Sequence, residues 1–228
     1  MPKPAIAVDI ETVGHEWEML APEVRAYLLE RERDESRRAE VPQRLALHPG
    51  TGRVVMIGVW YIDEERGRVL VEGAPAEWAA LDDRAQMLQG TEDAILREFW
   101  GLVREVGTIV TFNGRSFDGP YLMIRSAILG VEPSRNLVPY RYSFQDHCDL
   151  VDVLSFRGAR NVSGSLDFWC RQFGIPSPKE EVRGAAVGDL FRDERLRDLA
   201  RYCLGDARAT AQLYRRLRSI VKVLDARG

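Results

Sequence analysis

The chain has 228 residues, of which 45% are hydrophobic and 29% charged, as is typical of a globular protein with one full core. A formal net charge of −3 does not exclude a basic groove, because arginine is abundant and clustered. No apolar run approaches the ~20 residues of a membrane span, and residues 1–4 show no secretory pattern. Three cysteines without disulfide or zinc spacing favour a reducing cytoplasm; we expect Cys148, Cys170 and Cys203 to be buried.

The first predicted element is a strand at residues 5–12, which is apolar until it reaches Asp9 and Glu11. Residues two apart on a strand point to the same face, so the two carboxylates stand side by side. Burying such a pair without compensation costs on the order of several kcal/mol per group. A divalent cation between the two acids is therefore the expected compensation.

A long charged segment, from about residue 13 to 52, follows the acid pair directly. Its central part, from 16 to about 44, is predicted to be largely helical, and residues 49–52 form a turn. The segment is larger than a minimal domain needs, and two interpretations remain open. It is either a solvated helix stabilised by salt bridges or an arm that walls the substrate cleft.

Further strands are predicted at 53–61, 68–72, 108–112 and 148–154, and further helices at 91–106, from 116 or 117, at 165–173, and from about 193 to 224. Residues 63–67 suit a hairpin link. A strand hairpin followed by alternating helices and strands predicts an α/β fold with a mixed five-stranded sheet flanked by helices. Because no linker divides the chain, we expect one domain over residues 1–228, with 13–52 as an insertion between the first two strands.

Asp118 lies just past the carboxyl end of the strand at 108–112, where open α/β sheets place their ligands. An acid in the first turn of a helix also complements the helix dipole, which is the alternative reason for its position.

The last helix carries an acid within its apolar face. At about 100° per residue, Asp206 falls inside the stripe formed by Leu196, Leu199, Cys203, Thr210, Leu217 and Leu224. Tyr202 lies at the edge of the same stripe, because it precedes Asp206 by one helical turn. Gly205 weakens the helix, and we expect close packing against another element to account for its presence.

A second group of acids, Asp146, Asp149 and Asp152, surrounds the predicted strand at 148–154. Asp149 and Asp152 would point to opposite faces of that strand, so we expect structural roles, with Asp149 nearer the cleft. The three histidines, His15, His48 and His147, are scattered and are expected at the surface or in turns.

Three motifs carry a resemblance: Asp9-Ile10-Glu11-Thr12, Asn113-Gly114-x-x-Phe117-Asp118, and Tyr202-x-x-x-Asp206 with Thr210. In this order they resemble the motifs of the DEDD (DnaQ-like) 3′–5′ exonucleases, in the variety that has tyrosine in the third motif (DEDDy). The chain is similar to the proofreading exonuclease domains of family B DNA polymerases, from residue 4 to about 224. The resemblance implies a ribonuclease H-like fold. No polymerase module lies within the 228 residues, so we expect no proofreading in cis.

The resemblance also implies a mechanism, hydrolysis of the terminal phosphodiester with two divalent cations, Mg²⁺ or Mn²⁺. Asp9 would bridge both ions, Glu11 and Asp206 would complete the tighter site, and Asp118 would hold the second ion largely through water. Tyr202 would orient the attacking water through its hydroxyl.

The substrate-binding candidates are Thr12, Asn113, Phe117, Arg115, Arg157 and Arg160. Asn113 and Phe117 are expected at the terminal nucleotide, although core packing is an equally simple role for Phe117. Thr12 would meet the 3′-hydroxyl through its backbone. The three arginines would contact phosphates, while the loop at 157–164 is alternatively an ordinary surface loop.

The leading hypothesis is thus a metal-dependent 3′–5′ exonuclease that releases nucleoside monophosphates from single-stranded DNA. An exoribonuclease on the same scaffold is the alternative, because the sequence does not reveal how a 2′-hydroxyl is received. A non-catalytic nucleic-acid-binding module is a third reading.

Overall fold

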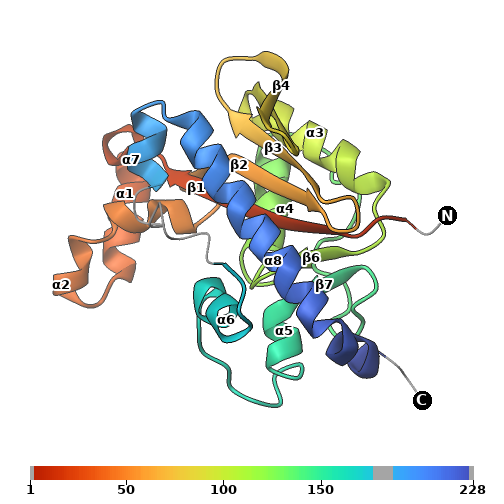
Figure 1. The fold of residues 1–228 in the computed structure, drawn as a ribbon. Helices are drawn as coiled ribbons and strands as arrows, with labels where there is room; N and C mark the ends of the chain where they lie inside the picture. The colour runs from red at the N-terminus through yellow and green to blue at the C-terminus, as the bar shows by residue number, and fades with distance from the viewer. Residues whose placement is uncertain (1–2, 177–186, 226–228) are drawn as a thin grey trace.

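The computed structural model describes residues 3–176 and 187–225, and a central sheet organises them (Figure 1). The seven strands lie in the order β4-β5-β3-β2-β1-β6-β7. They are β1 (Ile6–Gly14), β2 (Gly52–Tyr61), β3 (Arg66–Glu72), β4 (Ala76–Asp82), β5 (Ala85–Gly90), β6 (Ile109–Thr111) and β7 (His147–Asp149). The α-helices are α1 (Pro22–Arg31), α2 (Glu35–Arg38), α3 (Glu92–Arg104), α4 (Asp118–Ile128), α5 (Leu150–Leu154), α6 (Leu166–Gln172), α7 (Val187–Arg192) and α8 (Leu196–Asp225). Two short 3₁₀ helices, η1 (Trp17–Met19) and η2 (Pro42–Leu47), complete the described elements.

The sheet is mixed, as predicted, and the α/β class is confirmed. Strand β1 runs antiparallel to β2 and parallel to β6. The sheet has seven strands rather than five, because β4 and β5 form an antiparallel pair beside β3. These two strands contain four alanines and few β-branched or aromatic residues, so the pattern does not indicate them.

One β-bulge lies at the end of the acid pair. Glu11 pairs with Met56, but Thr12 pairs with Val54, so Val55 is an extra residue in β2. Bulges of this kind occur next to active sites, where they redirect the strand and its side chains.

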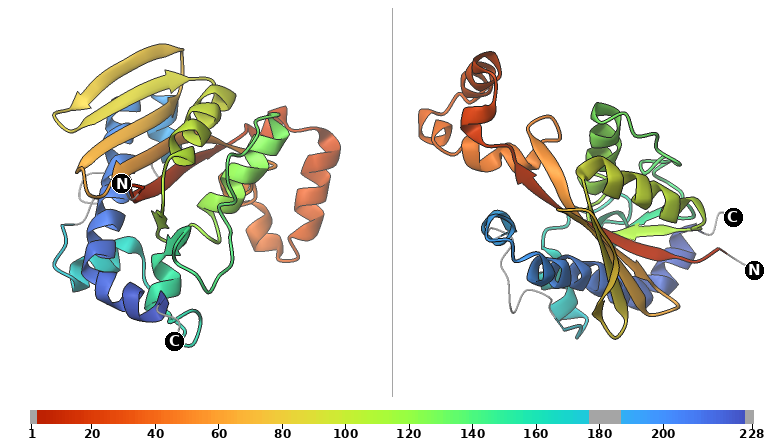
Figure 2. Two further views of the ribbon diagram at one scale, coloured as in Figure 1. Left: turned by 90° about the vertical axis from the view of Figure 1, so that its right-hand side faces the viewer. Right: turned by 90° about the horizontal axis from the view of Figure 1, so that it is seen from above.

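The two faces of the sheet are covered by different helices. Seen from above in Figure 2, α8 lies on one face and α3 and α4 lie on the other. The side chains of β1 alternate accordingly, because Ala7 joins the core under α8 while Ile6 and Val8 join the core under α3 and α4. Asp9 and Glu11 share the parity of Ala7 and therefore face α8.

The helix α8 contains 30 residues and buries Tyr202, Asp206 and the predicted stripe from Leu199 to Leu217, while Leu196 and Leu224 at its ends are half-buried. It begins at Leu196 rather than near residue 193, because the separate helix α7 precedes it. Its backbone approaches the sheet at Gly58 of β2, where an added Cβ would lie 3.0 Å from the Cys203 carbonyl oxygen. The close approach of α8 therefore requires a glycine in the sheet.

The region around the fifth predicted strand differs from the prediction. Only 147–149 is a strand, and residues 150–154 form α5. The Asp149 side chain caps this helix by accepting a hydrogen bond of 2.9 Å from the Val151 N–H. Ser165 caps α6 as predicted, accepting a hydrogen bond of 3.3 Å from the Phe168 N–H.

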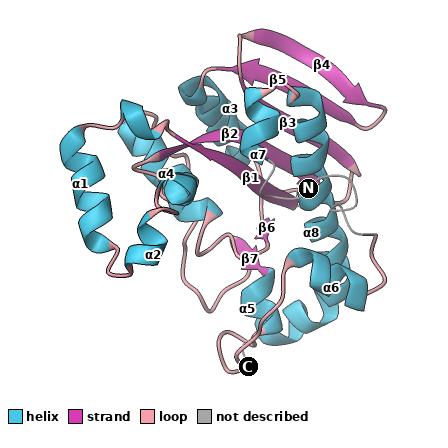
Figure 3. Cartoon of the chain, turned by 90° about the vertical axis from the view of Figure 1, so that its left-hand side faces the viewer, coloured by secondary structure: helices cyan, strands magenta, loops and turns pink. Residues whose placement is uncertain are grey.

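The insertion is helical, but it consists of η1, α1, α2 and η2 rather than one long helix. Neither α1 nor α2 buries a residue, and both extend away from the sheet (Figure 3). In contrast, η2 packs on β1 through the buried Leu45. The insertion therefore has an exposed tip and an anchored base.

All three cysteines are buried, as predicted. His147 is also buried, so the expectation of a surface position is wrong for this histidine. Of the described helices, none combines the length and apolar character that crossing a membrane requires.

Candidate active site

The acid pair of β1 meets α8 at Cys203. Ligand atoms of Asp9, Glu11 and Cys203 all lie within 4.8 Å of one another. The Cys203 thiol donates to the main-chain carbonyl of Asp9 at a distance of 3.6 Å. Complete burial, and then the charge of Asp9, raise the pKa of the Cys203 thiol well above its usual value. The thiol consequently stays protonated beside the carboxylates.

Tyr202 and Asp206 reach the same place from α8. The Tyr202 hydroxyl is hydrogen-bonded to the Asp206 side chain, and both residues are buried. Burial raises the pKa of Tyr202, and the charges of Asp206, Glu11 and Asp9 raise it further, in that order. A tyrosine that experiences all three charges lies in the middle of an acid cluster, and its hydroxyl remains protonated at neutral pH.

Asp118 is hydrogen-bonded to β1 on the side of the strand that faces β6. The N–H groups of β1 alternate between its two neighbours, and that of Ile6 points toward β6. The N–H of Ile10 points the same way, but β6 ends at Thr111, so the Asp118 carboxylate accepts this bond instead, at 3.1 Å. Asp118 is thereby fixed to the main chain between Asp9 and Glu11.

Asp118 is buried at the first position of α4. Burial is the main reason that the pKa of its carboxyl rises to about 7, and the nearby charge of Asp149 adds to the rise. An acid at this position also complements the dipole of α4. A place at the end of a strand and an interaction with the helix dipole are therefore compatible explanations for Asp118.

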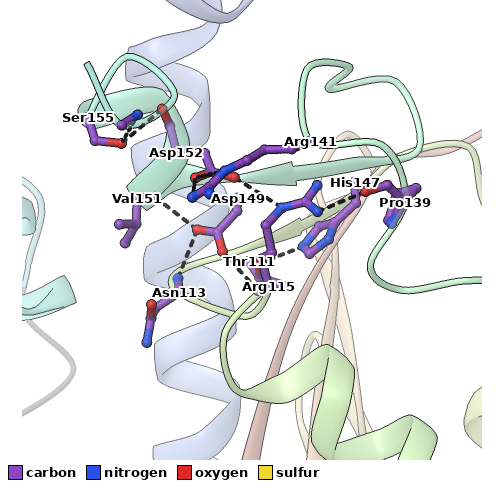
Figure 4. Close-up of polar contacts among 11 residues, drawn as sticks. Thr111, Asn113, Arg115, Pro139, Arg141, His147, Asp149, Val151, Asp152 and Ser155 are labelled. Carbon is purple, nitrogen blue, oxygen red and sulfur yellow. Dashed lines mark hydrogen bonds and ion pairs between the residues drawn. The ribbon is translucent and has the colours of Figure 1, made fainter. Parts of the chain in front are cut away.

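Asp149 holds the loop between β6 and α4, as Figure 4 shows. Its carboxylate accepts hydrogen bonds from the N–H groups of Asn113 at 2.9 Å and Arg115 at 2.8 Å, in addition to that of Val151. Asn113 is exposed and has a φ of 66°, which lies in the left-handed region that few residues other than glycine adopt. The buried acid therefore stabilises an unfavourable backbone conformation directly before the Asp118 motif.

Arg115 makes structural contacts rather than facing the acid cluster. Its Nε lies 3.0 Å from Asp152 Oδ2, and its guanidinium donates to the Pro139 carbonyl at 2.8 Å (Figure 4). Arg141 binds the other Asp152 oxygen at 2.7 Å. Because Asp152 lies on α5, the premise that it shares a strand with Asp149 is wrong. We do not retain Arg115 as a phosphate ligand.

Arg157 is likewise directed into the protein. Its guanidinium lies 4.7 Å from the Phe144 ring centroid and 3.9 Å from the Asp225 carboxylate. Arg160 is exposed in the same loop and remains a candidate for phosphate contact. Of the three predicted arginines, only Arg160 keeps that role.

Two cavities flank the acids. Thr12 and Phe117 line a cavity of about 640 Å³ that begins at Glu11. Asp9, Asn113 and Asp206 line another, of about 420 Å³. Phe117 is half-buried and packs on the Tyr121 ring with centroids 5.3 Å apart, so core packing and exposure to the cavity both apply to it.

Sequence reasoning missed the residues with which the insertion lines the larger cavity, notably Trp17, Gln43 and Leu47. The only available signal was the proximity of the segment to Glu11. Sequence reasoning also missed the hydrogen bonds by which Asp149 holds the loop between β6 and α4. Residues 150–154 were predicted as a strand, so a helix capped by Asp149 was not expected.

The donor set fits hard divalent cations. Asp9, Glu11, Asp118 and Asp206 offer carboxylate oxygens, which are the preferred ligands of Mg²⁺ and Mn²⁺. The sulfur atom that lies with Asp9 and Glu11 belongs to the protonated Cys203. These acids would hold the ions, and an ion among them would offset the repulsion of neighbouring carboxylates.

The chain matches a family described as a predicted 3′–5′ exonuclease related to the exonuclease domain of PolB, over residues 53–228. It is 28% identical over 180 residues to a DNA polymerase of Desulfurococcus sp. (strain Tok), covering 72% of this chain and 22% of that protein. It is 29% identical over 178 residues to a DNA polymerase of Thermococcus gorgonarius, covering 71% of this chain and 22% of that protein. The chain thus spans about a fifth of these two relatives.

The fold is similar to that of a solved family B DNA polymerase from Pyrobaculum calidifontis. The TM-score is 0.62 at 23% identity, with 100% of this chain and 28% of that chain covered. This similarity agrees with a ribonuclease H-like arrangement of the sheet and helices. The insertion and the acid pair of β1 lie outside the family match, which begins at Arg53.

Proposed function

Because the chain belongs to the family of predicted 3′–5′ exonucleases related to the exonuclease domain of PolB, we propose that it is a metal-dependent 3′–5′ exonuclease. Its substrate is the 3′ end of single-stranded DNA, and its products are nucleoside monophosphates. The observation that carries the proposal is the convergence of Asp9, Glu11, Asp206 and Tyr202 from β1 and α8. The DNA polymerases among its relatives support DNA as the substrate.

The proposed chemistry divides between ions and protein. Two Mg²⁺ or Mn²⁺ ions, when bound, supply an activated water and neutralise charge on the leaving oxygen. Asp9, Glu11, Asp118 and Asp206 hold and orient the site. Tyr202 acts as a hydrogen-bond donor rather than a base, because its raised pKa keeps the hydroxyl protonated.

The test is a digestion time course on DNA labelled at the 5′ end, with Mg²⁺, Mn²⁺ or EDTA. We expect stepwise shortening from the 3′ end with either ion and none with EDTA. Asp9→Ala and Asp206→Ala should lower the rate by about 10³-fold or more, since each removes a charge that holds the ions. Asp83→Ala, at an exposed acid between β4 and β5, is the matched control and should keep the wild-type rate.

Two results would change the proposal. If both acid variants digest DNA as the control does, the assigned site is wrong. If an RNA strand of the same sequence is digested faster than DNA at equal salt, the enzyme is an exoribonuclease.

A further inference from the structure

The cavity at Glu11 continues into a longer groove. The cavity of about 640 Å³ has η1 and η2 of the insertion on one side and α7 on the other. A second cavity, of about 900 Å³, shares residues 13–16 and Arg192 with it and extends toward Arg53 and Phe191. We call the two together the insertion groove. It starts at a predicted metal ligand and leads along the insertion.

The wall that η2 contributes is firmly attached. The Ala46 carbonyl accepts hydrogen bonds from the Thr12 hydroxyl at 2.8 Å and from the Tyr121 hydroxyl at 3.0 Å. Leu45 is buried against β1, where a Cβ on Gly14 would lie 2.7 Å from the Leu45 Cβ. Because these contacts fix η2 in advance, a ligand of the groove would not have to order its wall.

The surface of the groove is mixed, and aromatic and apolar side chains lie among its polar groups. Trp17 and Phe117 are half-buried in its walls, and the Leu47 side chain on η2 is 62% exposed. Base–aromatic stacking contributes about 1–3 kcal/mol per base, and it requires bases that are not already stacked in a duplex.

Among the described residues, both arginines that line the groove are ion-paired within the protein, and the acids in the lining outnumber them. Arg53 lies 3.0 Å from Glu72, and Arg192 forms an ion pair with Asp189. A groove whose lining arginines are ion-paired has few cations left for phosphates. Its contribution to affinity should therefore come from stacking more than from phosphate neutralisation.

We propose that the insertion groove binds the unpaired nucleotides of a single strand next to the hydrolysed 3′ residue, with Trp17 as the stacking residue. This inference rests on the proposed function for its occupant. The insertion lies outside the family match, so the proposed subsite is formed largely by a segment that the family model does not cover.

Binding is measured without hydrolysis, by fluorescence anisotropy of a labelled single-stranded oligonucleotide in EDTA or with Ca²⁺. Trp17→Ala should weaken binding about tenfold, and Trp17→Phe should restore most of the loss, because both rings stack. Leu47→Glu, at an exposed position that tolerates a charge, should also weaken binding. Tyr27→Ala is the matched control, because Tyr27 is an exposed aromatic residue on α1 that does not line the groove, and it should bind as the wild type does.

Two further comparisons make the proposal specific. A duplex of the same sequence should bind the wild type at least about tenfold more weakly, and this gap should narrow in Trp17→Ala. The affinity of the single strand should depend weakly on salt, with a slope well below the ~0.7 per phosphate that several phosphate contacts would give.

Equal affinities of folded Trp17→Ala, Leu47→Glu and wild type for the single strand would overturn the proposal, as would tighter binding of the duplex. Because the assay does not need turnover, it separates two failures. A protein that binds through Trp17 but does not digest DNA contradicts the proposed function and leaves the groove supported.

Discussion

The two faces of the sheet differ in how they treat buried charge. On the face under α3 and α4, Arg125 binds both oxygens of Glu92, at 2.8 and 2.6 Å, and donates to the Pro49 carbonyl at 3.0 Å. Glu92 also accepts the Val54 N–H at 2.8 Å. On the face under α8, acids lie beside acids; burial raises the pKa of Tyr202, and the charges of these acids raise it further. The first face pairs its buried charges, and the second concentrates negative charge that suits cations.

The sharpest test of this difference is Arg125→Met. It leaves Glu92 buried without its cation, so we expect the free energy of unfolding to fall by about 3–5 kcal/mol. The exonuclease rate of the folded protein should stay the same, because Arg125 lies on the face under α3 and α4, which we call the supporting face. Urea unfolding measures the first quantity, and Arg97→Met, at an exposed ion pair with Asp93, should cost no more than about 1 kcal/mol. Equal losses in the two variants would contradict the comparison.

His147 makes the stability of the folded protein depend on pH. Burial, and then the charge of Arg115, lower the pKa of this histidine to about 4 from an unfolded value of 6.5. Between pH 4 and pH 6.5 the unfolded chain binds more protons than the folded protein does. The contribution of neutral His147 to the free energy of unfolding is therefore fully present above pH 6.5 and is lost as the pH falls toward 4. The loss should reach about 3 kcal/mol at most.

Unfolding experiments at pH 7 and pH 4.5 check this contribution. In His147→Gln the acid-induced loss should be smaller than in the wild type, while His48→Gln, at an exposed turn, should behave as the wild type does. If His147→Gln and the wild type lose stability in parallel, His147 is not the group responsible.

The smallest expected effect lies on the face under α8. Tyr202→Phe removes the hydroxyl that is hydrogen-bonded to Asp206 and should lower kcat about tenfold, which is about 1.4 kcal/mol. The free energy of unfolding should stay close to that of the wild type, since the ring remains packed. Steady-state digestion of single-stranded DNA measures the rate, with Tyr214→Phe on the same helix as the control. A destabilised but fully active Tyr202→Phe would place this residue with the supporting face instead.

Much of the acid cluster is predictable because strand and helix periodicity place side chains directly. Asp9 and Glu11 share a face because they are two apart, and Asp206 lies in an apolar stripe whose period identifies it. Asp118 was predictable only as a position after a strand. Its bond to the Ile10 N–H depends on the early end of β6, which three-dimensional pairing determines.

The incorrect predictions have a common physical cause. In each, the structure depends on a specific partner that the sequence pattern does not reveal. Residues 150–154 are apolar enough for a strand, but the Asp149 side chain caps the first turn and favours a helix. Arg115 and Arg157 look available in the sequence, yet each finds an acid or a ring from a distant segment. Strand β4 lies at the edge of the sheet, where its residues are largely exposed and periodicity carries little information.

The extra residue at Val55 has a consequence for how this chain can vary over evolutionary time. Along β1, Asp9 lies opposite Gly58 and Glu11 opposite Met56 before the bulge. After the bulge, the pairing continues with a shift of one residue as far as Gly14 and Gly52. The bulge takes up the change of alignment, so lengthening or shortening the peptide between Gly14 and Gly52 leaves the carboxylates in place. Descendants of this protein can therefore acquire a different accessory segment while conserving the acid pair of β1.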